Sequence, residues 1–261
     1  MADETRTRRE PPRFRRGVVV STDRVTPRLA RIRLSGSELA GLSIEEPAAS
    51  IRLLVPSPGD NSLIIPDWSG NEFLRRDGSR PIIRTFTPRH LDGDTLTLEV
   101  VLHSEGAVSR WAASAEKGEE AAISGTGRGY TIDPNAAGFL LAGDESAMPA
   151  ISQLLEWLPP ATQVRAIIEI AEPEGRTSLP AHPSASVDWV ALPPDGAPGD
   201  ALVASVESAT IPPDWRVWAA GEAAAMYRIR KHLFDTLGLD RRHATVRGYW
   251  KHGRTTPGHL I

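Results

Sequence analysis

The sequence contains no cysteine among its 261 residues. This absence excludes disulfide bonds, catalysis by a thiolate, and zinc or iron–sulfur sites built on cysteine ligands. Any redox chemistry would therefore need a bound cofactor. We assign no metal site to the chain.

Long apolar runs are also missing. No stretch approaches the roughly 18 apolar residues that a membrane-spanning helix needs, and residues 1–16 carry six arginines instead of the apolar core of a signal peptide. We therefore expect a cytoplasmic protein without stable membrane insertion.

A strong net charge is absent too, because 30 Lys and Arg face 33 Asp and Glu. The distribution is uneven, since residues 227–261 hold eight Lys or Arg against two acidic residues. This basic end could attract an anionic ligand, or it could be a solvated helix and tail. No recognition motif and no interleaved aromatic residues accompany the charge, so we expect no nucleic-acid partner.

The composition that remains is that of a globular protein, with 40% hydrophobic residues, 22 glycines and 22 prolines. The length allows one large domain or two of about 130 residues, each able to bury a core. We expect two domains, and a monomer.

The first half has the pattern of antiparallel strands. Leu96, Leu98, Val100 and Leu102 alternate with polar or smaller neighbours and would place one apolar face inward. We expect a six-stranded antiparallel β-barrel domain over residues 14–133, a helix within it at 107–115, and a flexible stretch at 1–13. The expected strands are 17–21, 29–34, 51–55, 82–87, 95–103 and 120–124.

The second half has apolar runs without alternation, as expected for strands that are covered on both faces. They alternate with helical segments at 146–157, 200–208 and 222–237, which predicts a Rossmann-like parallel α/β domain over residues 134–261 with a basic C-terminal segment. The expected strands are 138–142, 163–171, 187–192, 215–220 and 244–249, and 172–186 reads as a loop.

Two motifs of the first half resemble flavin-binding signatures. The run Arg84, Thr85, Phe86, Thr87 is similar to the Arg-x-Tyr-Ser/Thr motif of ferredoxin–NADP reductase-like enzymes. That resemblance implies that the arginine pairs with flavin phosphate and the aromatic ring stacks on the isoalloxazine. Phenylalanine here keeps the stacking and loses the phenol hydrogen bond of the usual tyrosine.

The second motif ends an expected strand with a glycine that opens a helix, where N–H groups and the helix dipole favour phosphate. It is similar to the Gly-x-x-Ser pyrophosphate motif of the same superfamily. His103 beside it could be structural or catalytic. Counting the glycine loop 125–129, the resemblance implies further FAD contacts from His103, Gly106, Ala107, Val108, Ser109 and Thr126.

The second half offers two strand-to-helix junctions of the kind that bind dinucleotides. The first contains Gly143, Asp144, Glu145 and Ser146, although Asp144 or Ser146 could equally be a plain N-cap. The second contains Ala220, Gly221 and Glu222, with alanine where reductases of this superfamily have cysteine. We expect both junctions to contact NADH or NADPH.

The choice of donor is open. Glu169 and Glu172 end an expected strand, where a carboxylate can bind a ribose diol and repel a 2′-phosphate. Arg176, Arg228 and Arg230 could instead reach such a phosphate.

Taken in order, five motifs resemble those of the siderophore-interacting proteins, flavin-dependent ferric-siderophore reductases of bacteria. They are Arg-Thr-Phe-Thr, His-Ser-x-Gly-Ala-x-Ser, Gly-Asp-Glu-Ser-Ala-x-Pro-Ala-Ile, Ala-Gly-Glu and Gly-Tyr-Trp-Lys, between residues 14 and 253. The resemblance implies hydride transfer from NAD(P)H to FAD and one-electron reduction of siderophore-bound Fe(III), which releases iron as Fe(II). It also implies a basic triad for the siderophore, matched here by Arg52, Arg128 and Arg247, with Lys251 in reserve.

We assign no catalytic acid or base. Two alternatives stay open: an NAD(P)H-dependent flavin or electron-transfer reductase with another acceptor, and a non-enzymatic siderophore-binding flavoprotein. Ala220 in place of cysteine favours the second, because that cysteine helps to place the nicotinamide.

Overall fold

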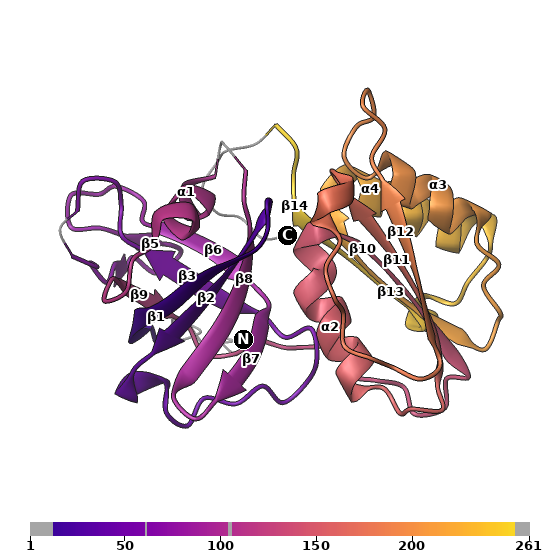
Figure 1. Cartoon of the computed structure of the whole chain (residues 1–261), viewed down its shortest axis with the longest axis horizontal. Coiled ribbons are helices and arrows are strands. Elements are labelled where there is room, and N and C mark those ends of the chain that lie inside the picture. The colour runs from indigo at the N-terminus through magenta and orange to yellow at the C-terminus, as the bar shows by residue number, and fades with distance from the viewer. Residues whose placement is uncertain (1–12, 61, 104–105, 254–261) are drawn as a thin grey trace, which may run out of the picture.

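The computed structural model describes residues 13–60, 62–103 and 106–253. They form two sheets that lie side by side, each with its own core (Figure 1). The flexible stretch predicted at 1–13 lies outside the described residues except for Arg13. No helix in the described part of the chain is long and apolar enough to cross a membrane.

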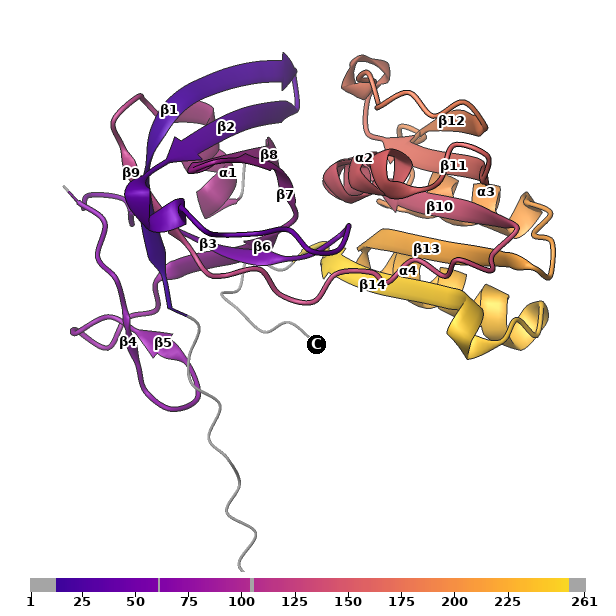
Figure 2. The same ribbon diagram turned by 90° about the horizontal axis from the view of Figure 1, so that it is seen from below.

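The first sheet has seven antiparallel strands in the order β6-β3-β9-β1-β2-β8-β7. It curls around its core as a half-barrel (Figure 2). The strands are β1 (Arg15–Thr26), β2 (Leu29–Ser35), β3 (Ile51–Val55), β6 (Ile82–Phe86), β7 (Pro88–Asp92), β8 (Thr95–Val101) and β9 (Glu120–Ile123). A small hairpin, β4 (Asp67–Trp68) and β5 (Phe73–Leu74), the short helix η1 (Ser37–Leu39) and α1 (Ala107–Ser114) complete this half.

Alternation explains this core, because Leu96, Leu98 and Val100 on β8 are at most 2% exposed. The antiparallel architecture was predicted, but β7 was missed and the number of strands was wrong. Pro88 has no N–H for a sheet hydrogen bond, and the register shifts between Pro88 and His90. A proline at a bulge on an edge strand does not resemble a strand in sequence.

The second sheet is parallel throughout, in the order β12-β11-β10-β13-β14. Its strands are β10 (Gly138–Asp144), β11 (Gln163–Ile170), β12 (Ala185–Ala191), β13 (Trp215–Glu222) and β14 (Ala244–Trp250). The helices are α2 (Met148–Trp157), α3 (Asp200–Ser208) and α4 (Ala223–Lys231), with the short turns η2 (Glu145–Ala147), η3 (Pro173–Gly175), η4 (His232–Thr236) and η5 (Arg241–His243). The predicted Rossmann-like arrangement is confirmed.

Helices cover both faces of this sheet. On β10, Phe139 and Leu141 pack in the cluster that contains α2, while Leu140 packs in the cluster that contains α3 and α4. Successive residues of one strand therefore lie in two different cores, which is why the runs are apolar without alternation. The chain runs from β10 to β11 and β12 on one side and then crosses back to place β13 and β14 on the other side of β10, so the carboxyl ends of β10 and β13 are the topological switch point.

Helix α2 joins the two halves (Figure 2). The Gln153 side chain is buried; its Oε1 accepts the N–H of Ala48 at 2.8 Å and its Nε2 donates to the carbonyl of Pro88 at 2.6 Å. Arg89 makes a bidentate pair with Glu156 at 2.7 and 2.9 Å. The strand that follows the Arg84–Thr87 motif is thus tied directly to the parallel half.

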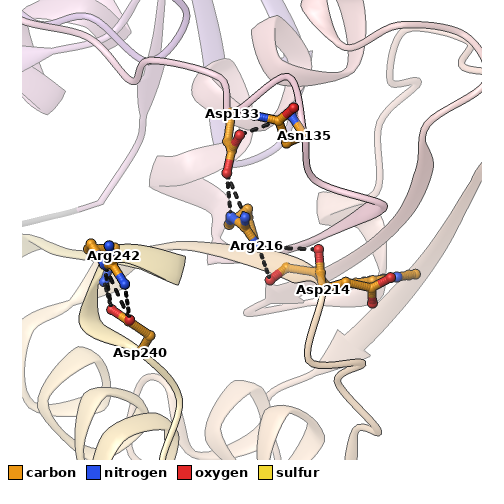
Figure 3. Close-up of polar contacts among 7 residues, drawn as sticks. Asp133, Asn135, Asp214, Arg216, Asp240 and Arg242 are labelled. Atoms are coloured by element: carbon orange, nitrogen blue, oxygen red, sulfur yellow. Dashed lines mark hydrogen bonds and ion pairs between the residues drawn. The ribbon is translucent and has the colours of Figure 1, made fainter.

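The connection between the halves is fixed at the amino ends of the parallel strands. Arg216 of β13 donates to Asp133 at 2.7 Å and to the carbonyl of Asp214, and Asp133 also accepts the N–H of Asn135 (Figure 3). These contacts hold the pKa of Asp133 below its usual range, chiefly through the Asn135 N–H and then Arg216. They lie at the opposite end of the strands from the switch point.

Candidate functional site

Arg84 lies half-buried on β6, and its guanidinium donates to the carbonyl of Ile83 at 2.8 Å. Burial lowers the pKa of Arg84, because the charged form loses solvation. No carboxylate pairs with it in the described part of the chain. A half-buried cation without a counter-ion is costly, and it fits a bound phosphate.

The rest of the motif divides between the two faces of β6. Phe86 packs against the core of the half-barrel and keeps part of its surface exposed, as does Arg84. Thr85 is exposed on the other face. Thr87 is buried and shares a hydrogen bond with the phenol of Tyr249, whose pKa is raised by burial. The Thr87 hydroxyl is thus occupied by β14.

Helix α1 contacts β6 and begins after Gly106 without a side-chain cap. The Ser109 hydroxyl accepts the N–H of His103 at 2.6 Å and donates to its carbonyl at 2.8 Å, which closes the turn. A Cβ on Gly106 would lie 2.5 Å from Nε2 of His103, so only glycine fits under that ring. The N–H groups of Ala107 and Val108 remain at an uncapped helix end, where phosphate is stabilised.

The glycine loop, which contains Thr126, makes hydrogen bonds to the preceding segment of the same domain. The Thr126 hydroxyl donates to the carbonyl of Ser43 at 3.0 Å, and Gly127 donates to the carbonyl of Ser50 at 2.6 Å. These contacts brace the loop against residues 43–50. The hydroxyl keeps its capacity to accept a hydrogen bond, and the predicted flavin contact of Thr126 stays a prediction.

The carboxyl ends of β10 and β13 meet at Asp144. One carboxylate oxygen accepts the Ser146 N–H at 2.9 Å and its hydroxyl; the other accepts the Glu222 N–H at 2.9 Å and the Trp250 indole at 2.7 Å. Burial raises the pKa of Asp144, and the hydrogen bonds from Ser146, Trp250 and Glu222 oppose this. The carboxylate holds three segments together.

The Glu169 carboxylate also accepts hydrogen bonds from backbone N–H groups of the protein. It accepts the N–H of Gly199 at 2.7 Å and that of Leu202 at 2.9 Å, and so it caps α3. Burial raises its pKa, and those two N–H groups oppose the rise. The role of Glu169 in binding a ribose diol stays a prediction, from a side chain that is buried and caps α3.

Glu222 caps α4 in the same way. One carboxylate oxygen accepts the N–H groups of Ala224 and Ala225, at 2.5 and 2.9 Å, and the other accepts the N–H of His252 at 3.2 Å. Glu145 pairs with Arg28 at 3.0 Å, and burial raises its pKa. Asp144 and Glu222 thus both act as N-caps, which is the simpler of the two alternatives for Asp144.

The two glycines of the junctions are required by packing. A Cβ on Gly143 would collide with Ala147 and lie 2.8 Å from the carbonyl of Ala220, and a Cβ on Gly221 would lie 2.7 Å from Oδ2 of Asp144. Ala220 is fully buried in the cluster that contains α2. The close approach of β10 and β13 accounts for all three small residues.

The predicted siderophore arginines gather near the connection. Arg247 of β14 donates to the carbonyl of Gly129 at 3.0 Å. Arg128 is exposed, and it and Arg247 both act on the carboxylate of Glu46.

Arg52 and Lys251 complete the predicted set. Arg52 lies on β3 opposite Thr85, two residues after Ser50, which contacts the glycine loop. Lys251 is exposed just after β14. The four side chains thus come from three separate segments.

Comparison with known proteins decides the family. A family model described as "Siderophore-interacting FAD-binding domain" matches residues 18–130, and one described as "Siderophore-interacting protein" matches residues 136–253. The crystal structure of a siderophore utilization protein from T. fusca is 33% identical, with a TM-score of 0.83, over 96% of this chain and 97% of that chain. The chain belongs to the siderophore-interacting protein family.

Curated relatives agree. An uncharacterised protein of Mycobacterium tuberculosis is 39% identical over 190 residues, which are 67% of each chain. Ferric vibriobactin reductase ViuB of Vibrio cholerae is 26% identical over 237 residues, 88% of this chain and 86% of ViuB. The resemblance drawn from five motifs is confirmed.

As a siderophore-interacting protein, the chain carries an FAD-binding domain. The residues present fit that cofactor, because Arg84 is a half-buried cation without a carboxylate partner among the described residues, and α1, which contacts β6, begins after a glycine that offers no side-chain cap. FAD, predicted from the motifs, is confirmed as the cofactor of this family domain.

Sequence reasoning missed several residues that connect the site. Tyr249 and Trp250 were noted only as parts of a motif, yet they bind Thr87 and Asp144. Gln153 carries no local signal, since a glutamine in an apolar helix reads as a surface residue. Glu46 was passed over because a single acidic residue in a loop has no pattern.

Proposed function

We propose that this siderophore-interacting protein is a flavin-dependent ferric-siderophore reductase. FAD, when bound, accepts a hydride from NADH or NADPH and gives up single electrons, so that one donor molecule reduces two ferric ions and one proton is released. Fe(III) is held tightly by hard oxygen ligands and Fe(II) less tightly, so reduction frees the iron. The unpaired, half-buried guanidinium of Arg84 is the observation that carries the flavin assignment.

The chain's own residues would hold and orient the cofactor. Arg84 and the N–H groups at the start of α1 would bind the pyrophosphate, with Ser109 keeping the turn closed. Phe86 would stack on the ring system from the same face of β6 as Arg84. Residues 14–133 would form the flavin domain and residues 134–261 the nicotinamide domain. We still assign no residue to proton transfer.

The nicotinamide donor is proposed from topology. The crevice between β10 and β13 is where an open parallel sheet binds nucleotides. Side chains that could choose between NADH and NADPH are engaged elsewhere: Glu169 caps α3, Arg228 pairs with Asp200, and Arg230 donates to the carbonyl of Val246 at 2.6 Å. Arg176 is exposed, so both donors stay in the proposal.

The electron acceptor, a ferric siderophore, is proposed from the basic residues near the glycine loop and from sequence similarity to a named relative. ViuB is named as a ferric vibriobactin reductase. Arg128 and Arg247, with Arg52 and Lys251 on neighbouring segments, would attract and orient a ferric siderophore without binding the iron. A monomeric state and a cytoplasmic location stay predictions.

The test is an anaerobic titration of the purified protein. We expect its flavin absorbance bands to bleach with NADH or NADPH, and to return when ferrichrome is added as the Fe(II)–ferrozine complex forms. Flavin that bleaches and is reoxidised by other acceptors but not by ferric siderophores would support a different reductase. Bound flavin that neither donor bleaches would support the siderophore-binding flavoprotein instead.

A further inference from the structure

The cluster of predicted siderophore arginines contains a carboxylate. Glu46 accepts the N–H of Gly129 at 3.1 Å, and Arg247 donates to the carbonyl of that same glycine at 3.0 Å. Arg128 and Arg247 both interact electrostatically with the Glu46 carboxylate. A negative charge therefore lies among the positive charges that would receive an anionic chelate.

This charge is fixed in position. The second oxygen of Glu46 accepts the Thr131 hydroxyl at 2.6 Å. Its neighbour Pro47 accepts the Tyr130 N–H at 2.8 Å, and a Cβ on Gly129 would lie 2.5 Å from the Cβ of Glu46. Each oxygen of the carboxylate thus has a hydrogen-bond partner, and the backbone beside Glu46 is held at Pro47.

The pKa of Glu46 lies below its usual range, chiefly through the Thr131 hydroxyl and then through the Gly129 N–H and the two arginines. The residue therefore stays ionised at neutral pH. A surface with Arg128, Arg247 and one fixed carboxylate attracts anions less than the two arginines alone would.

We propose that Glu46 is a specificity-determining residue that weakens the preference of this surface for anionic ferric chelates, so that neutral and cationic ferric hydroxamates compete with anionic ferric catecholates. The inference rests on the proposed function. Two unit charges about 6 Å apart in water change an affinity about threefold. Removing the Glu46 charge should therefore change affinity about threefold for each charge on the chelate.

The experiment measures dissociation constants of the FAD-loaded protein for three probes at low ionic strength. The probes are ferric enterobactin, a trianionic tris-catecholate; ferrichrome, a neutral trihydroxamate; and ferrioxamine B, a monocationic trihydroxamate. In Glu46→Gln we expect the preference for ferric enterobactin over ferrichrome to rise about 30-fold, and ferrioxamine B to bind about threefold more weakly. Added salt should shrink both changes.

Two matched variants separate charge from structure. Glu45→Gln removes the same charge one residue away, where the carboxylate accepts only the Ser43 hydroxyl in the described part of the chain. Thr131→Val removes the hydroxyl that holds Glu46 but no charge. We expect Thr131→Val to leave the ranking of the three probes within about twofold of the unmodified protein, and Glu45→Gln to change it clearly less than Glu46→Gln does.

The outcomes are distinct. An unchanged ranking in Glu46→Gln, or the same change in Glu45→Gln or Thr131→Val, overturns the role of Glu46 and leaves the proposed function standing. If the unmodified protein binds and reduces none of the three probes, the proposed function fails, and the inference about Glu46 fails with it.

Discussion

Two places in this molecule gather helix ends that attract anions, and the chain treats them in opposite ways. At β6 and α1, Arg84 has no counter-ion in the described part of the chain and Gly106 begins an uncapped helix. At the carboxyl ends of the parallel strands, the chain's own carboxylates of Asp144, Glu169 and Glu222 supply the negative charge. The first place has a positive charge without a paired carboxylate among the described residues, and the second has carboxylates that already accept its N–H groups.

The difference matters for affinity. Where the protein leaves positive charge half-buried, a ligand phosphate gains a charge-assisted hydrogen bond and relieves an unpaired cation. Where carboxylates cap the helices, a ligand phosphate would meet like charge. We therefore expect FAD to bind more tightly than the nicotinamide donor.

The largest expected effect is the loss of stability when the Asp144 carboxylate at the ends of the parallel strands is removed. Asp144→Ala would leave the Glu222 N–H and the Trp250 indole without their acceptor. Buried unsatisfied donors cost about 1–3 kcal/mol each, so we expect a loss of about 3 kcal/mol in the free energy of unfolding, measured in urea. Asp144→Asn keeps one acceptor oxygen, so it should lower the free energy of unfolding by about half as much. A loss below about 1 kcal/mol in the alanine variant would argue against this role.

The next largest effect should be a loss of FAD affinity when the Arg84 charge is removed. Arg84→Gln removes the half-buried charge and should weaken FAD binding about 30-fold, the equivalent of about 2 kcal/mol for a hydrogen bond to a charged group. Flavin fluorescence during titration of the apoprotein measures this. The control is Arg80→Gln, because Arg80 forms an exposed pair with Glu72. Equal affinities in both variants would remove Arg84 from the flavin site.

The free energy of unfolding should depend on pH because the carboxylates at the ends of the parallel strands are buried. Burial raises the pKa of Glu169, and of Asp144 and Glu145 beside it, so the folded protein binds protons that the unfolded chain has released. That contribution is fully present below the unfolded pKa of about 4 and is lost as pH rises through the folded values. We expect unfolding free energy to fall between about pH 4.5 and pH 7.

Glu169→Gln supplies the control for this pH effect, because glutamine does not titrate. In that variant the fall in unfolding free energy over the same pH range should be smaller than in the unmodified protein. An unchanged slope would show that Glu169 does not take up a proton on folding.

The smallest effect concerns the ring of the flavin motif. Phe86→Tyr restores the phenol of related reductases and adds one hydrogen-bonding group at the partly exposed edge of β6. A neutral hydrogen bond contributes about 0.5–1.5 kcal/mol, so FAD occupancy should rise about threefold at limiting cofactor. Equal occupancy in the two proteins would show that phenylalanine costs nothing here.

Sequence reasoning succeeded where the signal is local. The alternation of Leu96, Leu98 and Val100 predicted antiparallel strands, and the uninterrupted apolar run from Phe139 to Ala142 predicted a strand covered on both faces. It failed at β7, where Pro88 hides an edge strand. The helical segment predicted at 222–237 is confirmed, as α4 followed by the π-helical turn η4. The resemblance implied that Arg84 and Gly106 contact the same cofactor, and in the structure the helix α1, which begins after Gly106, contacts β6.

The candidate nicotinamide residues show the limit of such reasoning. A glycine followed by acidic and hydroxyl residues at a strand end predicts either a nucleotide loop or an N-cap, and the letters are the same for both. Only the contacts of Asp144 with Trp250, 106 residues away, and of Glu169 with Gly199 show that these carboxylates are occupied.

The sequence by itself determined the two kinds of sheet, the lack of any thiol chemistry and the family, because periodicity, composition and ordered motifs are properties of neighbouring residues. Only the tertiary structure decided which charges are paired. Among the residues that the structure describes, Arg84 has no paired carboxylate, Asp144 accepts several hydrogen bonds, and Glu46 interacts with Arg128 and Arg247. Whether a charge is solvated, buried or neutralised depends on residues that are distant in the chain, and folding alone brings them together.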